Sequence, residues 1–432
     1  MLPYTWEKRD NPAVYYEDYM PVLTDVGEVL HVSSLPSWDY VARWYERLSE
    51  TKAKADPEVK EVVAGLWDNQ TSLSESDKAR MIYDFIVKNI RYSSISFRQS
   101  GLIPQKASDV LNTKIGDCKD VSTLFVAMCK EAGLKADLVL VNTRDNGRYD
   151  LLLPSINFNH CIAKVNLDEE EYYVELTSDK LPFSSVHYSL RNSFVLNIDK
   201  NRKDEDKEEP MFLNPENKKK NIVSRNTSIS FRGTDMDLKV ASYKTGDYGT
   251  WMRESYSDIG TEQQEKRMLE SVGNSLSGVK LKKLKFDENL YNTSDTVSYV
   301  TEYSASNALT RLSNLMLFRI PYNEKQMPVD FLSDNSRKYP VDFWQYWAYD
   351  VAKEVIEVEI PEGKTLLELP KDQNFTCSMA DYSLTFKVKG NKLVITRVVD
   401  IKKELMPVED LAETRSFFEK VVAADDTQLA FQ

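Results

Sequence analysis

The spacing of apolar residues changes from a helical period to a strand period after residue 134, and this order constrains the fold. Apolar side chains recur every three or four positions in residues 37–50, SWDYVARWYERLSE, behind a serine at the capping position, which predicts an amphipathic helix. Residues 74–90, SESDKARMIYDFIVKNI, predict a second helix. Residues 114–134, KIGDCKDVSTLFVAMCKEAGL, predict a third one that starts at Cys118 and is buried along its length.

Short strand patterns follow the third helix. The segments ADLVLVNT, FNHCIAKVNL and YYVEL have the apolar character of strands, and the acidic residues 168–171 form a turn between the last two. Helices that are followed by consecutive strands predict an α+β domain, which ends near residue 199.

Strand patterns also dominate the C-terminal half. Residues 383–401, SLTFKVKGNKLVITRVVDI, alternate on both sides of the turn Gly390–Asn391, which is a clear hairpin signal. Helical patterns interrupt around residues 261–272 and 409–422. This half therefore predicts a β-sandwich-type region, and we find no chemical motif in it.

Together the patterns divide the chain into four parts. Residues 1–36 predict a strand segment, interpreted as the remnant of a truncated β-domain, because aromatic, strand-like residues open the chain. Residues 37–199 form the α+β core. Residues 200–221 are so rich in charges that they predict a solvated linker, and residues 222–432 form the β-rich region.

The charge balance narrows the choice of partners. The chain has 56 Lys and Arg residues against 68 Asp and Glu residues, a net charge of −12, which argues against nucleic acid as the main partner. No apolar run approaches the roughly 20 residues of a membrane helix, so no membrane-spanning segment is predicted. The start, MLPYTWEKRDNP, lacks the pattern of a signal peptide. The sequence leaves the oligomeric state open.

The cysteines are candidates for chemistry. They contain no C-x-x-C pair and are too few for a disulfide framework, which predicts free thiols at Cys118, Cys129, Cys161 and Cys377. A lone cysteine in an apolar helix is usually part of the core, and this interpretation fits Cys129. Cys118 differs because it stands at a helix N-terminus, where Asp117 is placed to cap the first turn.

Of the three histidines, His160 is the one with a candidate partner. It opens a strand, and Glu175 follows in the neighbouring strand. In a hairpin the carboxylate can hold one imidazole nitrogen while the other faces the Cys118 thiol, as nucleophilic catalysis requires. The helix dipole and an imidazolium both favour thiolate. A zinc site that also uses Cys161 is disfavoured, because adjacent strand residues point to opposite faces, and no metal or cofactor is predicted.

The same residues resemble a known family. NIRYSSISF, IPQKASDVLNTKIGDCKDVSTLFVAMCKEAGLKADLVLV, FNHCIAKV and YYVELTSD are similar to the bacterial branch of the transglutaminase-like superfamily, a distant relative of papain-like cysteine proteases. The resemblance covers residues 70–185 in detail. The flanks resemble the β-domains that accompany this core in exported Bacteroidetes-type proteins.

The resemblance has consequences for fold and location. It implies a papain-like core in which the helix that carries the cysteine packs on an antiparallel sheet. It also implies export to the periplasm or cell envelope, with the leader missing from this chain, while a cytoplasmic location stays open.

Roles carry over residue by residue. Cys118 matches the family nucleophile, His160 the general base, and Glu175 the position that aspartate usually holds. Glutamate is one methylene longer, so it orients the imidazole only if its backbone lies slightly further back. Where the family commonly has the tripeptide DPT, residues 175–177 of this chain read ELT. The backbone N–H of Cys118 is the expected oxyanion donor, and Tyr92, where the family often has an aromatic side chain, is a further candidate.

Two functions are compatible with these residues. The first is a cysteine-dependent amide hydrolase or acyltransferase, similar to a protease or amidase, which attacks a peptide or protein carboxamide and forms a thioester. The excess of water and the lack of a calcium-loop motif favour hydrolysis. The alternative is an inactive scaffold that binds a peptide, glycan or envelope protein, an interpretation that Glu175 and the large C-terminal half keep open.

Overall fold

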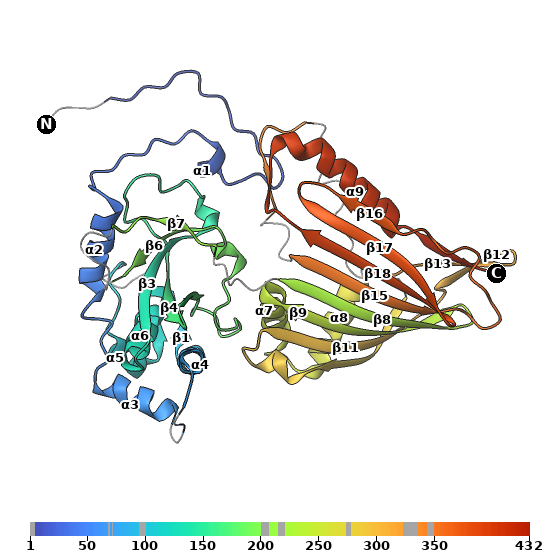
Figure 1. Cartoon of the computed structure of the whole chain (residues 1–432), viewed down its shortest axis with the longest axis horizontal. Coiled ribbons are helices and arrows are strands. Elements are labelled where there is room, and N and C mark those ends of the chain that lie inside the picture. The colour runs from blue at the N-terminus through green and yellow to red at the C-terminus, as the bar shows by residue number, and fades with distance from the viewer. Residues whose placement is uncertain are drawn as a thin grey trace.

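The structure is a computed structural model that describes residues 5–67, 70, 72–94, 101–199, 207–214, 221–273, 278–322, 336–343 and 350–432. Within these ranges the chain forms a core of helices and a five-stranded sheet, followed by a β-rich C-terminal region (Figure 1). The fold class is α+β, as the order of patterns predicts. No helix in these ranges is long and apolar enough to cross a membrane.

The helices of the core are α2 (Trp38–Ser49), α3 (Pro57–Leu66), α4 (Glu75–Asn89), α5 (Ala107–Thr113) and α6 (Cys118–Glu131). Three of them begin at the capping residues Ser37, Ser74 and Asp117, whose side chains accept a hydrogen bond from a backbone N–H of the first turn. Every residue of α6 from Lys119 to Cys129 is buried, because α6 lies between the sheet and helices α3, α4 and α5.

The core sheet has the strand order β5-β4-β3-β6-β7, and all neighbours are antiparallel. Its strands are β3 (Lys135–Asn142), β4 (His160–Leu167), β5 (Glu170–Val174), β6 (Phe194–Ile198) and β7 (Met211–Phe212). Asp168 and Glu169 join β4 to β5 with φ angles of 50° and 70°, the left-handed conformation that a tight hairpin turn requires. This hairpin brings the start of β4 close to the residues that follow β5.

An eight-stranded sheet dominates the C-terminal region, in the order β10-β11-β9-β8-β15-β18-β17-β16. Its strands are β8 (Ile222–Arg232), β9 (Asp235–Thr245), β10 (Val279–Phe286), β11 (Thr296–Ala305), β15 (Val351–Glu359), β16 (Gln373–Thr376), β17 (Ala380–Lys389) and β18 (Lys392–Ile401). Neighbours are antiparallel except β8 and β15, which run parallel. Strands β17 and β18 form the hairpin that the sequence predicts around Gly390–Asn391.

One face of this sheet is covered, and the central strands accordingly alternate between buried and more exposed residues. The covering elements are the helices α7 (Gly246–Tyr256), α8 (Thr261–Gly273) and α9 (Leu411–Asp425) and a small sheet of β12 (Leu309–Leu312), β13 (Leu315–Arg319) and β20 (Gln428–Phe431). A further short pair joins β14 (Val341–Asp342) to β19 (Leu405–Met406). The region is rich in antiparallel strands and consistent with the β-sandwich type that the sequence predicts.

Two segments at the edges of the core differ from the sequence prediction. Among the described residues 5–36 there is no strand: they contain the short helix α1 (Leu23–Val26), and Tyr15 and Tyr16 are exposed because no sheet covers them. Part of the predicted linker is strand β7, whose Phe212 packs against Phe194 of β6 with ring centroids 5.9 Å apart. The charged residues 200–206 and 215–220 lie outside the described residues.

Buried polar contacts join the C-terminal region to the core. Arg144 donates hydrogen bonds to Asp342 Oδ1 at 2.5 Å and to Glu404 Oε2 at 2.8 Å. Thr293 Oγ1 donates to Asp84 Oδ1 of α4 at 2.7 Å. Separating a buried ion pair leaves a charge without its partner, which is costly, so these contacts favour one arrangement of the two parts.

Candidate active site

The N-terminus of α6 is held by a short strand pair and a reciprocal cap. The strand β1 (Arg91–Tyr92) pairs in parallel with β2 (Ile115–Gly116), which leads directly into the helix. The backbone N–H of Asp120 donates to Asp117 Oδ1 at 3.3 Å, and the backbone N–H of Asp117 donates to Asp120 Oδ2 at 3.2 Å. Cys118, the first helical residue, therefore stands at a well-anchored position.

His160 and Glu175 are in direct contact. His160 Nε2 lies 2.7 Å from Glu175 Oε2, while Glu175 Oε1 accepts hydrogen bonds from the backbone N–H of Thr177 at 2.9 Å and from its Oγ1 at 2.7 Å. The Glu175 side chain is only 4% exposed, so these bonds form away from bulk water. Glu175 comes directly after the last residue of β5, and from there the longer side chain reaches the imidazole.

The charges of this pair shift both pKa values. Burial acts to lower the pKa of His160, but the negative charge of Glu175 and hydrogen bonds with Cys118 and Glu175 outweigh it and raise this pKa from 6.5 to about 10. Burial acts to raise the pKa of Glu175, but the charge and hydrogen bond of His160 and the bonds from Thr177 outweigh it, so this pKa is lowered. At neutral pH the pair is an imidazolium and a carboxylate.

Cys118 is the third member of the cluster. Its thiol lies beside the His160 side chain, both in the wall of one cavity, and is close enough to raise the pKa of the imidazole. Because Nε2 is directed at Glu175, Nδ1 is the ring nitrogen left for the thiol. The structure thus brings the three sequence-predicted residues together, in the arrangement that a nucleophile, its base and an orienting acid require. Their catalytic roles stay predictions at this point.

The cluster opens into a cavity of about 260 Å³ between α2, β1, the start of α6 and the segment before β4. Tyr92 of β1, a sequence-predicted site residue, lies in its wall with 40% of its surface exposed. Burial and the nearby Cys118 raise the pKa of the Tyr92 hydroxyl.

Sequence reasoning missed the aromatic residues that α2 contributes to this wall, Trp44 and Tyr45. They belong to the apolar stripe of α2, and a stripe with helical spacing predicts burial rather than a site. Burial and the nearby Cys161 and Cys118 raise the pKa of Tyr45. No local signal in residues 37–50 separates these two residues from the other core positions.

The remaining cysteines are buried. Burial raises the pKa of the Cys129 and Cys161 thiols and favours their neutral form. Strand alternation predicts that Cys161 points away from the site, yet Cys161 borders the cavity. The reason is that its face of β4 packs on α6, the helix that also carries Cys118. Within the described ranges, no group of three or more His, Cys, Asp and Glu side chains is arranged to hold a metal ion.

Family comparisons cover the part of the chain that contains this site. Residues 61–176 match the family model of the transglutaminase-like superfamily, a range that includes Cys118, His160 and Glu175. This part of the chain is therefore a transglutaminase-like domain. Residues 312–431 match a second family, described as a domain of unknown function with a solved structure. No curated protein matches the chain.

Two solved structures are similar to the chain. A protein from Parabacteroides distasonis, described as a "putative protease", is 13% identical and superimposes over 97% of this chain with a TM-score of 0.57. The chain spans 63% of the length of that protein, and the likeness shows the fold alone. A "putative cysteine protease" from Cytophaga hutchinsonii is 18% identical, covering 28% of this chain and 37% of its own, with a TM-score of 0.21.

The raised pKa of His160 predicts how the stability of this protein depends on pH. The folded state keeps a proton between pH 6.5 and about 10 that the unfolded chain has lost. The contribution of His160 to stability is therefore complete below about pH 6.5 and is lost as the pH rises through about 10. The free energy of unfolding should fall across this window by at most about 1.4 kcal/mol per pH unit from this group.

Urea unfolding of the wild type and of Glu175→Gln at several pH values between 6 and 10 checks this dependence. The substitution removes the negative charge that raises the His160 pKa, so the slope should become shallower in the variant. Subtracting the two curves removes the contribution of the other groups that titrate in this range. Identical slopes would show that the pair does not hold its proton.

Proposed function

We propose that this protein is a cysteine-dependent amide hydrolase, with Cys118 as nucleophile, His160 as acid and base, and Glu175 as the residue that orients His160. The observation that carries the proposal is the 2.7 Å contact between His160 Nε2 and Glu175 Oε2, which directs the other ring nitrogen to a thiol at a helix N-terminus. This arrangement supports a thiolate beside an imidazolium.

The proposed reaction begins when the thiolate of Cys118 attacks the carbonyl carbon of a carboxamide. A C–S bond forms and the carbonyl oxygen takes up the negative charge. The backbone N–H of Cys118 has no partner inside α6 because it belongs to the first turn, so it is available to this oxygen. Tyr92, in the wall of the same cavity, is the proposed second donor.

The intermediate then collapses. The C–N bond breaks as His160 gives its proton to the leaving nitrogen, and a thioester with Cys118 remains. Water attacks the thioester while His160 takes one of its protons, and the carboxylic acid leaves. An amine in place of water would give transamidation by the same steps, and water is favoured by its concentration.

A peptide library incubated with the full chain in ¹⁸O-labelled water, together with a biotinylated primary amine, tests the proposal. Hydrolysis through a thioester places one ¹⁸O in each new carboxyl group, which mass spectrometry detects without knowledge of the substrate. We expect ¹⁸O-labelled products with the wild type and none with Cys118→Ser. Biotinylated products would assign the acceptor as an amine, and the absence of both products would contradict the proposal.

A further inference from the structure

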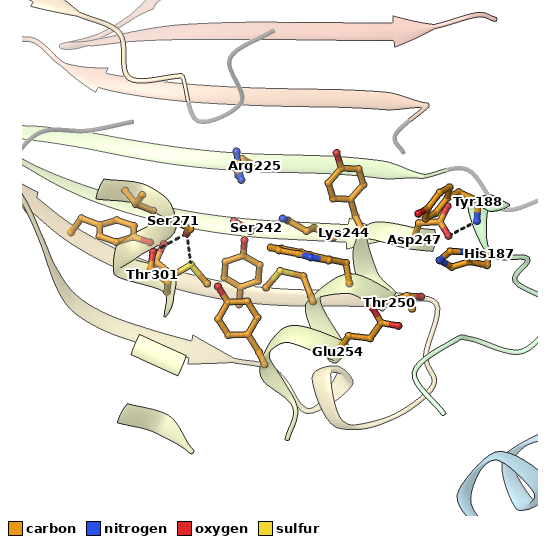
Figure 2. Close-up of a pocket in the computed structure, with 18 residues that line it drawn as sticks. His187, Tyr188, Arg225, Ser242, Lys244, Asp247, Thr250, Glu254, Ser271 and Thr301 are labelled. Atoms are coloured by element: carbon orange, nitrogen blue, oxygen red, sulfur yellow. Dashed lines mark hydrogen bonds between the residues drawn. The ribbon is translucent and has the colours of Figure 1, made fainter. Parts of the chain in front are cut away.

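A second cavity, of about 570 Å³, lies in the C-terminal region between the sheet strands β8, β9 and β11 and the helices α7 and α8. Cavities that hold small molecules commonly measure about 300 to 1,000 Å³. Figure 2 shows Lys244 near the middle of this cavity, with Ser271 and Thr301 at one end and His187 and Asp247 at the other. No residue that lines this cavity also lines the cavity at Cys118.

Lys244 is a buried cation in this cavity. It lies on the inward face of β9 with only 4% of its surface exposed. Its Nζ stands 5.4 Å from the ring centroid of Tyr248 and 5.4 Å from that of Trp251, both on α7. Across the described part of the chain, no carboxylate forms an ion pair with Lys244. A buried ammonium group is costly unless it is paired, and two aromatic faces compensate for this cost only partly.

The second cation of the cavity wall already has a counter-ion. Arg225 of β8 lies 3.8 Å from Glu354 of β15, and Glu354 accepts a hydrogen bond from Arg397 of β18 at 2.8 Å. Arg397 in turn donates to Asp425 of α9. Positive and negative side chains thus alternate from Arg225 through Glu354 and Arg397 to Asp425. Both carboxylates face arginines, and neither forms an ion pair with Lys244.

The acidic residues that border the cavity are also accounted for. Asp247 accepts hydrogen bonds from Asn221 Nδ2 at 2.6 Å, from the backbone N–H of Tyr188 at 3.1 Å and from Arg191 at 3.2 Å. Glu254 is exposed at the rim. Among the described lining residues, Lys244 is therefore the buried cation for which no ion pair with a carboxylate is found.

The rest of the wall suits a flat apolar group. Trp251 lines the cavity and is 50% exposed, although it is a large aromatic residue. Tyr248 lies beside it on α7, and Tyr299 of β11 faces the same space. Aromatic side chains offer apolar contact area to the body of a ligand, and the cation beside them attracts a negative group at its end.

We propose that this cavity binds an organic anion whose carboxylate or phosphate pairs with Lys244 and whose flat apolar part packs against Trp251 and Tyr248. The proposal does not depend on the function of Cys118, because it rests on a different cavity in a different part of the chain. Removing the charge of Lys244 should then weaken binding at least ten-fold without a loss of stability, since no ion pair with a carboxylate is lost with it.

Titration calorimetry and ligand-observed NMR on the full chain test the proposal with three matched probes. Phenylacetate supplies a carboxylate, phenyl phosphate supplies a phosphate, and phenylacetamide is the neutral counterpart of the first. We expect at least one anion to bind at least ten-fold more tightly than phenylacetamide. Whichever anion binds more tightly identifies the chemical source of the negative group.

Three variants locate the site. Lys244→Met should weaken binding of the anion at least ten-fold and leave the melting temperature at or above that of the wild type. Lys239→Met is the matched control, since Lys239 lies on the exposed face of the same strand, and its binding should equal that of the wild type. Trp251→Ala, at a half-exposed position, should weaken binding at least three-fold.

Several results would overturn the proposal. It is wrong if neither anion binds the wild type, if phenylacetamide binds as tightly as the anions, or if binding survives Lys244→Met unchanged. Should Lys244→Met fail to fold, Trp251→Ala and the ratio of anion to amide affinity in the wild type still decide the matter.

Discussion

Replacing Cys118 with alanine is expected to lower kcat/KM for a carboxamide substrate by about 10⁴-fold or more. In the proposed reaction the thiol forms the bond to the substrate, and among the described residues of the cavity wall it is the proposed nucleophile. Cys118 is half-buried in the first turn of α6, where alanine is a good helix former, so the melting temperature should change by only a few degrees. Steady-state kinetics and thermal unfolding of the same preparations check both expectations.

The matched control is Cys377→Ser. Cys377 is buried in the C-terminal region, and its sulfur accepts hydrogen bonds from the backbone N–H groups of Met379 and Ala380, which a serine oxygen also accepts. This variant should keep wild-type activity. Retention of a tenth or more of the activity by Cys118→Ala would remove the thiol from the proposed reaction.

Replacing Glu175 with alanine is expected to lower kcat/KM by about 10²- to 10⁴-fold. His160 then loses the carboxylate that orients its ring, and its pKa should fall from about 10 towards 6.5. NMR titration of the imidazole measures this shift independently of turnover. Glu171→Ala is the control, because Glu171 lies on the same hairpin but pairs with Lys164 and has a half-exposed side chain.

Glu175→Asp separates charge from reach. Aspartate keeps the negative charge but is shorter by one C–C bond, about 1.5 Å, so the 2.7 Å contact with His160 is lost unless the backbone moves. We expect activity between that of wild type and Glu175→Ala. Full activity in Glu175→Asp would show that the length of glutamate at this position is not required.

Local patterns in the sequence were sufficient to predict much of the core. The helix from Cys118 and the hairpin of β4 and β5 have strong local signals, namely a cap with a helical apolar stripe and two apolar segments around an acidic turn. Once these elements pack together, their ends meet, and this is why the proximity of His160 to Glu175 could be expected from spacing.

The features that the sequence did not reveal depend on contacts between distant segments. Trp44 borders the cysteine cavity only because α2 packs near the start of α6, and Met211–Phe212 becomes a strand only because β6 offers a free edge. A lysine in an alternating strand likewise gives no signal of burial, and Lys244 is buried because the helices α7 and α8 cover this face of β9. The local spacing of apolar residues does not predict any of these contacts between distant segments.

The alkylation rate of Cys118 by iodoacetamide, measured between pH 5 and 9 in the full chain and in His160→Ala, tests the central claim most directly. Peptide mass spectrometry reports the modified residue, so no substrate is needed. The account predicts that Cys118 reacts at pH 6, where a free thiol with a pKa of about 8.5 is almost entirely protonated. It also predicts that His160→Ala slows this reaction at least 100-fold. A rate at Cys118 that follows the pH profile of a free thiol, and that is unchanged by His160→Ala, would contradict it.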